Sequence, residues 1–276
     1  MSPDQHAPSE SRPTEHLEHL RLEWPAPGVA RLVLDNAAQR NAMSEPMTAS
    51  WVAAVARLAG DPEVRVVVVT GEGTAFCSGG DTAWIASEPE AGVDRLRTRM
   101  LAFYRAWLSI RSLEVPTIAA INGPAIGAGL CVALACDLRY AGAGARVGAP
   151  FVKLGMNPGM ASTYLLPDVV GEAVARELLL TGRLVGAQEA QELGLVTRVH
   201  PDADLADAVL AVAEQVAATA PVASRYTTLG LRQRHRDLES CLQWEAFAQP
   251  VTLATEDLQE GIAAARERRP PVFTGR

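Results

Sequence analysis

The sequence contains two places where a short apolar run leads into closely spaced glycines. The first run covers residues 65–70 and is followed by the loop Thr74-Ala-Phe-Cys-Ser-Gly-Gly-Asp81. The second segment is Ile118-Ala-Ala-Ile-Asn-Gly-Pro-Ala-Ile-Gly-Ala-Gly-Leu130. β-Branched runs predict strands, and glycine lets a backbone approach a ligand closely. Each segment is therefore predicted to be a strand that delivers backbone N–H groups to a site.

The central part of the chain repeats a short strand, a loop and a helix. Strands are predicted at residues 65–70, 117–121, 138–141 and 145–148. A helix over residues 93–112 carries apolar residues at three- and four-residue steps, which predicts that this face belongs to the core and not to a site. Short strands that alternate with helices predict an α/β layer arrangement.

The N-terminal part of the chain has a different pattern of polar and apolar residues. Residues 1–15 are polar and interrupted by prolines, which predicts a disordered leader without chemistry. The runs at residues 20–24 and 29–34 have period-two patterning and predict a β-hairpin. Ser44 is expected to cap a helix that ends at Ala59.

From about residue 203 onward the pattern is entirely helical. Helices are predicted over residues 205–220, 221–234, 237–253 and 255–268. The expected organisation is therefore a leader over residues 1–15, an α/β core over residues 16–202 and a helical region over residues 203–276.

Composition limits the possible functions. The net charge of −7 gives no support for nucleic-acid binding, which needs a basic field. The apolar windows are too short or too interrupted to span a bilayer, and the N-terminus lacks a hydrophobic signal region, so a cytoplasmic enzyme without membrane contact is expected. The four cysteines are scattered and far from the five histidines, so neither a metal site nor a histidine triad is expected.

A glycine pattern at Gly142-Ala-Gly-Ala-Arg-Val-Gly148 invites a dinucleotide-binding interpretation. Its spacing is one residue longer than the G-x-G-x-x-G pattern. The helix that would receive a pyrophosphate would also have to pass through Pro150 and Pro158, which lack N–H donors. We therefore expect no bound cofactor.

Five further segments, together with the two glycine loops, make the chain resemble the crotonase superfamily, the enoyl-CoA hydratase/isomerase fold. They are Arg40-Asn-Ala-Met43, Ala135-Cys-Asp-Leu-Arg-Tyr140, Leu178-Leu-Leu-Thr-Gly182, the stretch over residues 187–199, and Arg269-Pro-Pro-Val-Phe-Thr-Gly275. The resemblance runs from about Leu20 to the end of the chain. It implies a repeated ββα spiral core and a C-terminal helical region that makes trimer contacts.

The resemblance also implies a substrate and a site. The N–H groups of Gly80 and Ala128 would point at the oxygen of an acyl-CoA thioester, so that coenzyme A enters as part of the substrate, in a homotrimer or hexamer. The further substrate-binding residues that it implies are Arg40, Ala42, Ser78, Asp81, Trp84, Gly127 and Phe273. An alternative for Asp81 is that its carboxylate only caps a following helix through Trp84. An alternative for Arg40 is an ordinary solvated loop residue.

The chain departs from the family where the hydratases place two glutamates. Cys131 stands at the first of these positions and Phe151 at the second, and neither is a carboxylate base. Cys131 could act only as a thiolate with a lowered pKa. The other polar candidates nearby are Asn157, Ser162, Thr163 and Tyr164, although Ser162 and Thr163 are also expected simply to start a helix.

Two functions remain open from the sequence. One is an enoyl-CoA hydratase-like lyase or isomerase that stabilises an enolate through two N–H groups and uses atypical acid/base residues. The other is a catalytically degenerate member that binds acyl-CoA or acts as a scaffold. Met100, Trp84 and Phe151 are candidates for an apolar acyl pocket in either case.

Overall fold

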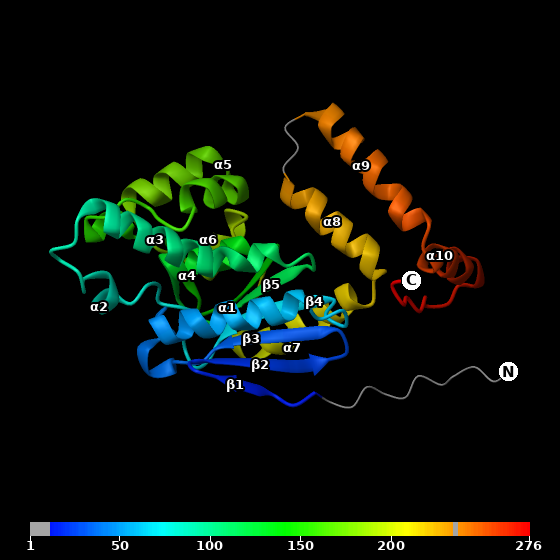
Figure 1. The fold of residues 1–276 in the computed structure, drawn as a ribbon, viewed down its shortest axis with the longest axis horizontal. Helices are drawn as coiled ribbons and strands as arrows, with labels where there is room; N and C mark the ends of the chain where they lie inside the picture. Colours follow the sequence, from blue (N-terminus) through cyan, green and yellow to red (C-terminus); the bar gives the residue numbers. More distant parts are fainter. Residues whose placement is uncertain (1–11, 234–236) are drawn as a thin grey trace.

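A seven-stranded sheet forms the centre of the molecule in this computed structural model, which describes residues 12–233 and 237–276 (Figure 1). Its strands lie in the order β1, β2, β3, β4, β5, β7, β10. Their bounds are β1 Glu15–Leu17, β2 Leu20–Ala26, β3 Val29–Leu34, β4 Val66–Gly71, β5 Thr117–Ile121, β7 Leu138–Gly142 and β10 Arg198–His200. The first three strands are antiparallel, and every pairing from β3 to β10 is parallel.

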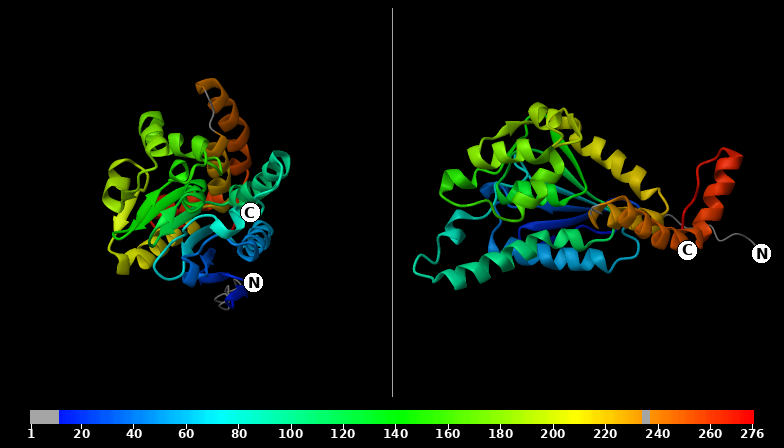
Figure 2. Two further views of the ribbon diagram at one scale, coloured as in Figure 1. Left: turned by 90° about the vertical axis from the view of Figure 1, so that its left-hand side faces the viewer. Right: turned by 90° about the horizontal axis from the view of Figure 1, so that it is seen from above.

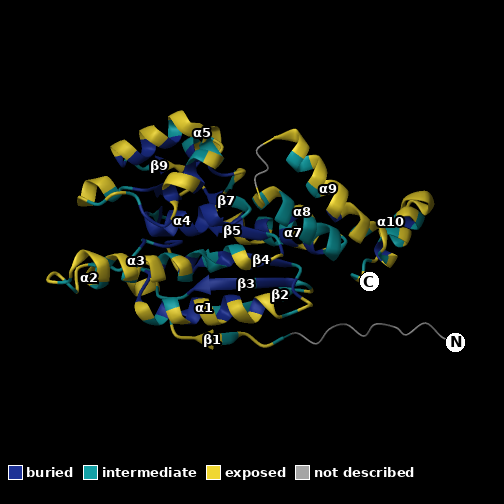
Figure 3. Ribbon diagram, turned by 45° about the horizontal axis from the view of Figure 1, so that its top comes forward, coloured by how far each residue is buried: buried dark blue, intermediate teal, exposed yellow. Residues whose placement is uncertain are grey.

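The parallel strands are buried on both faces of the sheet. Alternate residues point to opposite faces, so neighbouring residues of one strand enter different cores. Val67 and Val69 belong to the larger core, whereas Val66 and Val68 belong to a smaller one on the other face. Figure 3 shows β3, β4 and β5 as a continuous buried band. The β-branched run that marks β4 in the sequence is explained by this double burial.

Helices cover both faces of the sheet. The larger core includes residues of α1 (Glu45–Ala59), α3 (Val93–Trp107), α4 (Ala128–Ala135) and α5 (Ser162–Thr181). The smaller core is closed by α7 (Leu205–Ala217). Helix α4 is buried along its whole length, so its start is held firmly against the neighbouring loops.

The remaining short elements connect these layers. A second sheet contains β6 (Ala125–Ile126), β8 (Arg146–Gly148) and β9 (Val185–Gly186), with β8 in the middle. The short helices are α2 (Thr82–Ile85) and α6 (Ala187–Glu192), and the 3-10 turns are η1 (Ala37–Gln39), η2 (Leu108–Ser112), η3 (Phe151–Leu154) and η4 (Asp202–Asp204).

The C-terminal helices extend away from the sheet, as the two views of Figure 2 show. They are α8 (Pro221–Gln233), α9 (Leu238–Leu253) and α10 (Glu256–Glu267). Arg232 of α8 ties this region to the core, because its guanidinium lies 2.6 Å from the Asp137 carboxylate and also bonds backbone carbonyls before β5. Within the described residues, no single helix is long and apolar enough to cross a membrane. Only the bent pair Asp202–Ala217 and Pro221–Gln233 reaches that length and apolarity when the two helices are taken together.

Most predicted elements are confirmed. The hairpin forms as β2 and β3, and Ser44 caps α1 through the Met47 N–H. The helix predicted over residues 93–112 ends as an α-helix at Trp107 and continues as the 3-10 turn η2. Strand β1 is an unpredicted addition that begins at Glu15, the last residue of the expected leader, of which residues 1–11 lie outside the described part.

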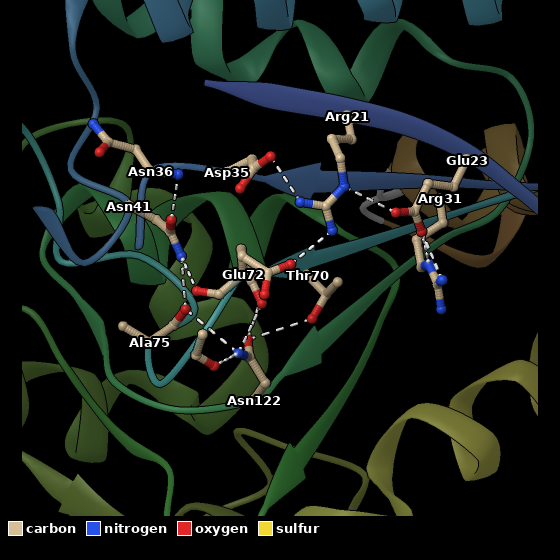
Figure 4. A network of polar contacts seen from close by, with 12 residues as sticks. Arg21, Glu23, Arg31, Asp35, Asn36, Asn41, Thr70, Glu72, Ala75 and Asn122 are labelled. Atoms are coloured by element: carbon tan, nitrogen blue, oxygen red, sulfur yellow. Dashed lines mark hydrogen bonds and ion pairs between the residues drawn. The ribbon is translucent and has the colours of Figure 1, made fainter. Parts of the chain in front are cut away.

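Two asparagines, the buried Asn41 and the partly buried Asn122, hold the loop that joins β4 to the first glycine segment (Figure 4). Asn41 Nδ2 donates to the carbonyls of Glu72 at 3.0 Å and Ala75 at 2.8 Å. Asn122 Nδ2 donates to the carbonyls of Gly71 at 2.8 Å and Gly73 at 3.0 Å. These bonds satisfy carbonyls at the end of β4 and in the loop that follows it. The loop therefore has a fixed path into the segment that follows.

Removal of the first of these amides should destabilise the fold. Asn41→Ala leaves several buried carbonyls without a donor, so the free energy of unfolding should fall by about 2–4 kcal/mol. Urea unfolding would measure this change. Asn157→Ala, at an exposed position, is the matched control and should change stability by less than about 0.5 kcal/mol. Equal stabilities of the two variants would contradict the assigned role of Asn41.

Candidate active site

The two glycine segments pack directly against each other. The carbonyl of Cys77 accepts a hydrogen bond from Ile126 N at 3.0 Å, and Cys77 forms a parallel bridge with Ala125. A Cβ added to Gly129 would stand 2.3 Å from the Cys77 oxygen, so only glycine permits this contact. The contact brings the loop before Asp81 to the first turn of α4.

Ala128 is the first residue of α4, and its N–H is therefore open. The first bond of the helix runs from Cys131 N to Gly127 O, at 3.2 Å. The N–H groups of a first helical turn have no intrahelical partner. Gly127 makes the turn into the helix at φ +57°, a conformation that favours glycine.

Gly80 carries the second open N–H. Gly80 forms a parallel β-bridge with Met43. The hydrogen bonds of this bridge are made by the residues on either side of Gly80: Met43 N donates to Gly79 O at 2.8 Å, and Asp81 N donates to Met43 O at 3.4 Å. The N–H of Gly80 itself points away from Met43 because alternate groups of an extended segment point to opposite sides. A Cβ at Gly79 would lie 3.5 Å from Ala128 N, so the residue before Gly80 lies against the start of α4.

A loop with left-handed backbone lies against this pair of donors. Arg40 ends η1 at φ +52°, and its carbonyl accepts from Ser78 N at 3.0 Å. Its side chain is exposed, and Ala42 is partly buried. The structure thus brings Arg40 to Ser78 and, through the bridge from Met43, brings the same loop to Gly80, and the part of these residues in substrate binding stays a prediction.

Asp81 acts as a helix cap. Its carboxylate accepts from Ala83 N at 2.8 Å and from Trp84 N at 3.3 Å, so the capping alternative describes its contacts. The cap positions Trp84, whose ring lies 5.0 Å from that of Phe103 and is covered by the Arg99 guanidinium at 3.8 Å. Asp81 therefore fixes the start of α2 and, with it, the position of Trp84.

The apolar face of the helix over residues 93–112 belongs to the core, as predicted, with Phe103, Trp107 and Ile110 buried in it. Phe103 would also lie 3.9 Å from a Cβ on Gly80, so the helix passes beside the proposed site as well. A groove of about 730 Å³ opens between α1, α2 and α3. Met43, Trp84 and Phe103 contribute its apolar lining, whereas Met100 packs against the core.

Cys131 and Phe151 both lie beside the open donors. The Phe151 ring is 3.7 Å from the position of a Cβ on Gly127. Cys131 is one turn into α4 and fully buried. Burial raises the pKa of its thiol to about 12 and outweighs the neighbouring Ser162 hydroxyl, which acts to lower it. The condition on which Cys131 could act, a thiolate with a lowered pKa, is therefore not met.

The other acid/base candidates separate by exposure. Thr163 and Tyr164 are exposed, and Asn157 is exposed with its amide donating to Pro158 O at 3.1 Å. Ser162 is buried and begins α5. Tyr104 of α3, which sequence reasoning missed, lies close to Ser162 and Cys131 through their common neighbour Gly159. Its only signal in the sequence was its place beside Phe103.

Phe273 is not brought to the other site residues within this chain. Its carbonyl accepts from Arg65 Nη2 at 2.9 Å, at the start of β4, whereas Gly80 follows the other end of that strand. The nearby Arg269 is paired with Glu260 and Glu267. A role for Phe273 in binding the substrate therefore stays a prediction.

The fold and the packed glycine segments define an α/β protein in which the loop after β4 lies against the start of the buried helix α4. A family model described as enoyl-CoA hydratase/isomerase matches residues 26–276, and the chain belongs to this family. The chain is 40% identical over 246 residues to the "Putative enoyl-CoA hydratase" of Thermus thermophilus, covering 89% of this chain and 97% of that protein. It is 33% identical over 273 residues to the mitochondrial methylglutaconyl-CoA hydratase of Rattus norvegicus, covering 97% and 86% of the two chains.

Solved structures agree with this assignment. The crystal structure of enoyl-CoA hydratase from Bacillus anthracis superposes with a TM-score of 0.88 at 32% identity. The match covers 94% of this chain and 100% of that one. The predicted α/β fold with a helical C-terminal region is therefore confirmed.

The close contact at Gly129 gives a direct test of the site's architecture. Gly129→Ala places a Cβ against the Cys77 backbone, which should cost about 1–3 kcal/mol of unfolding free energy and displace the open donors. Gly186→Ala is the matched control, because its Cβ would meet nothing within 4 Å at φ −78°. Chemical unfolding of both variants measures the difference. Wild-type stability of Gly129→Ala would show that the two segments are not packed as described.

Proposed function

We propose that this chain binds an acyl-CoA thioester and stabilises its enolate or oxyanion through the N–H groups of Gly80 and Ala128. The observation that supports the proposal is the close packing of the two glycine segments, with Gly79 and Gly129 of one segment each against the backbone of the other. Preorganised N–H groups aimed at a developing negative oxygen are often the largest single contribution to acyl chemistry. The names of the relatives support a thioester of coenzyme A as the ligand.

The electrostatics of α4 favour the same role. Its N-terminus carries partial positive charge, and the helix is buried along its length, which keeps solvent screening low. Gly127 turns the chain so that Ala128 presents its N–H to the site. A negative oxygen placed there would meet donors that need no reorganisation.

The acyl-CoA would lie across the loop around Arg40. Because the chain has a net charge of −7, a polyanionic nucleotide needs local partners. Arg40 has an exposed guanidinium suited to phosphate, with Ala42 and Ser78 beside it. The acyl chain would pass between Phe151 and Phe103 toward the groove at Trp84.

A homotrimer or hexamer is part of this proposal. Several large apolar side chains of α8 and α9 are exposed in the single chain: Leu231, Leu238, Leu242, Phe247, Val251 and Leu253. Contiguous exposed apolar residues mark interaction surfaces. Contacts between copies would cover this surface, and Phe273 could then approach a neighbouring site.

Removal of one donor should abolish most turnover. Gly80→Pro deletes an N–H, and loss of one such donor is expected to lower kcat by about 100- to 1000-fold. Gly80→Ala keeps the N–H, and its Cβ meets the flexible end of Ile85 at 3.1 Å and Phe103 at an ordinary contact distance of 3.9 Å, so its kcat should fall by less than about tenfold. The measurement is the kcat of both variants with an acyl-CoA thioester, and thermal unfolding confirms that both are folded. Full activity of folded Gly80→Pro would contradict the assignment.

The enzyme and the degenerate alternative differ in proton chemistry. If the donors stabilise an enolate, the protein should exchange an α-proton of butyryl-CoA into deuterated water, and it should hydrate crotonyl-CoA if a water is also activated. Mass spectrometry measures the exchange, and loss of the enoyl absorbance measures hydration. Tight binding of both thioesters without either reaction would instead support an acyl-CoA-binding or scaffold protein.

A further inference from the structure

A cavity of about 390 Å³ lies at the C-terminal end of α1. Its wall is formed by the last residues of α1, the turn over residues 60–62, the segment over residues 112–115, and Arg225 of α8. The loop that carries Arg40 leads into the other end of α1, at the cap Ser44. Because α1 has 15 residues, its two ends are about 22 Å apart. The cavity is therefore separate from the proposed thioester site.

Arg225 is the one cation among the residues that line this cavity. Its side chain is partly buried, and its Nε is shielded from solvent without a hydrogen-bond partner. Within residues 12–233 and 237–276, no carboxylate or carbonyl accepts a hydrogen bond from the guanidinium. A guanidinium has five N–H donors and a permanent positive charge. A cation that lacks an acceptor from the described chain thus lines the cavity.

Arg232, on the same helix, shows what a fully partnered arginine of α8 looks like. Its guanidinium lies 2.6 Å from the Asp137 carboxylate and donates to the carbonyls of Arg111 at 3.2 Å and Val115 at 3.4 Å. Seven residues are close to two helical turns, so Arg225 projects from the same side of α8. The carbonyls that a second guanidinium could have used are thus already bonded to Arg232.

The acidic residues of the cavity wall do not pair with Arg225. The Asp61 carboxylate lies 2.5 Å from Arg12, which lowers its pKa. Glu114 is exposed and forms no ion pair with any residue that the structure describes. At the end of α1, the Leu58 carbonyl accepts from Asp61 N at 3.3 Å. The acceptor that completes the guanidinium must therefore come from outside the cavity wall.

We propose that this cavity binds a small oxyanion, a phosphate or a carboxylate, through the guanidinium of Arg225. The planar fork of an arginine matches two oxygens of either group and forms charge-assisted hydrogen bonds with them. The volume of about 390 Å³ lies at the lower end of small-molecule sites, which suits an anion with few carbon atoms. The bound anion would join α8 to the end of α1, beside the Arg232 ion pair. This site is independent of the proposed function.

Calorimetric titration with inorganic phosphate and with butyrate, at constant ionic strength, tests the site. The wild-type protein should bind at least one of them at a single saturable site, with a Kd of about 0.1–10 mM. Arg225→Gln should weaken this binding by at least about tenfold, and Arg225→Lys, which keeps the charge but not the fork, by about three- to tenfold. Arg97→Gln removes an exposed cation of α3 and is the matched control, with an unchanged Kd.

Glu114 gives a second, opposite readout. Its negative charge at the cavity opposes an anion, so Glu114→Gln should tighten binding by about two- to fivefold. Without added anion, neither Glu114→Gln nor Arg225→Gln should lower the unfolding temperature, since the two side chains are not paired.

Three results would overturn the site. The first is the absence of saturable binding of both anions to the wild-type protein, and the second is an unchanged Kd in both Arg225 variants. The third is an equal loss of unfolding temperature in Arg225→Gln and Glu114→Gln without added anion, which would make Glu114 the partner of Arg225. If Arg225→Gln does not fold, Arg225→Lys and Glu114→Gln decide the result through their Kd values.

Discussion

The close backbone contact between Gly129 and Cys77 is the constraint on which the proposed site depends. A side chain at position 129 would meet the Cys77 oxygen at 2.3 Å, so the loop and the helix could not approach each other. The Asn41 and Asn122 amides fix the path of the loop before it reaches that contact. The position of two N–H groups is thus set by buried packing over two strands and a helix, and not by flexible side chains.

Burial has a second effect on the chemistry of this site. The same packing that fixes α4 removes water from Cys131 and raises the pKa of its thiol to about 12. The packing that holds the start of α4 in place therefore also keeps this thiol neutral near pH 7.

Much of the fold could be predicted because its signals are local. The valine run of β4 and the Ser44 cap lie within a few residues of the structure that they specify. The two glycine segments could be paired only through the family resemblance, because their contact joins residues some fifty positions apart. Tyr104 could not be found in this way, since the period of α3 groups it with core residues and its neighbours Cys131 and Ser162 come from other helices.

The absence of a carboxylate at Cys131 and Phe151 also changes the electrostatic balance of the proposed site. A carboxylate near the thioester would supply a base, but its negative charge would oppose the charge that develops on the oxygen at Gly80 and Ala128. Under the proposed function, Cys131 and Phe151 place no such charge beside that oxygen.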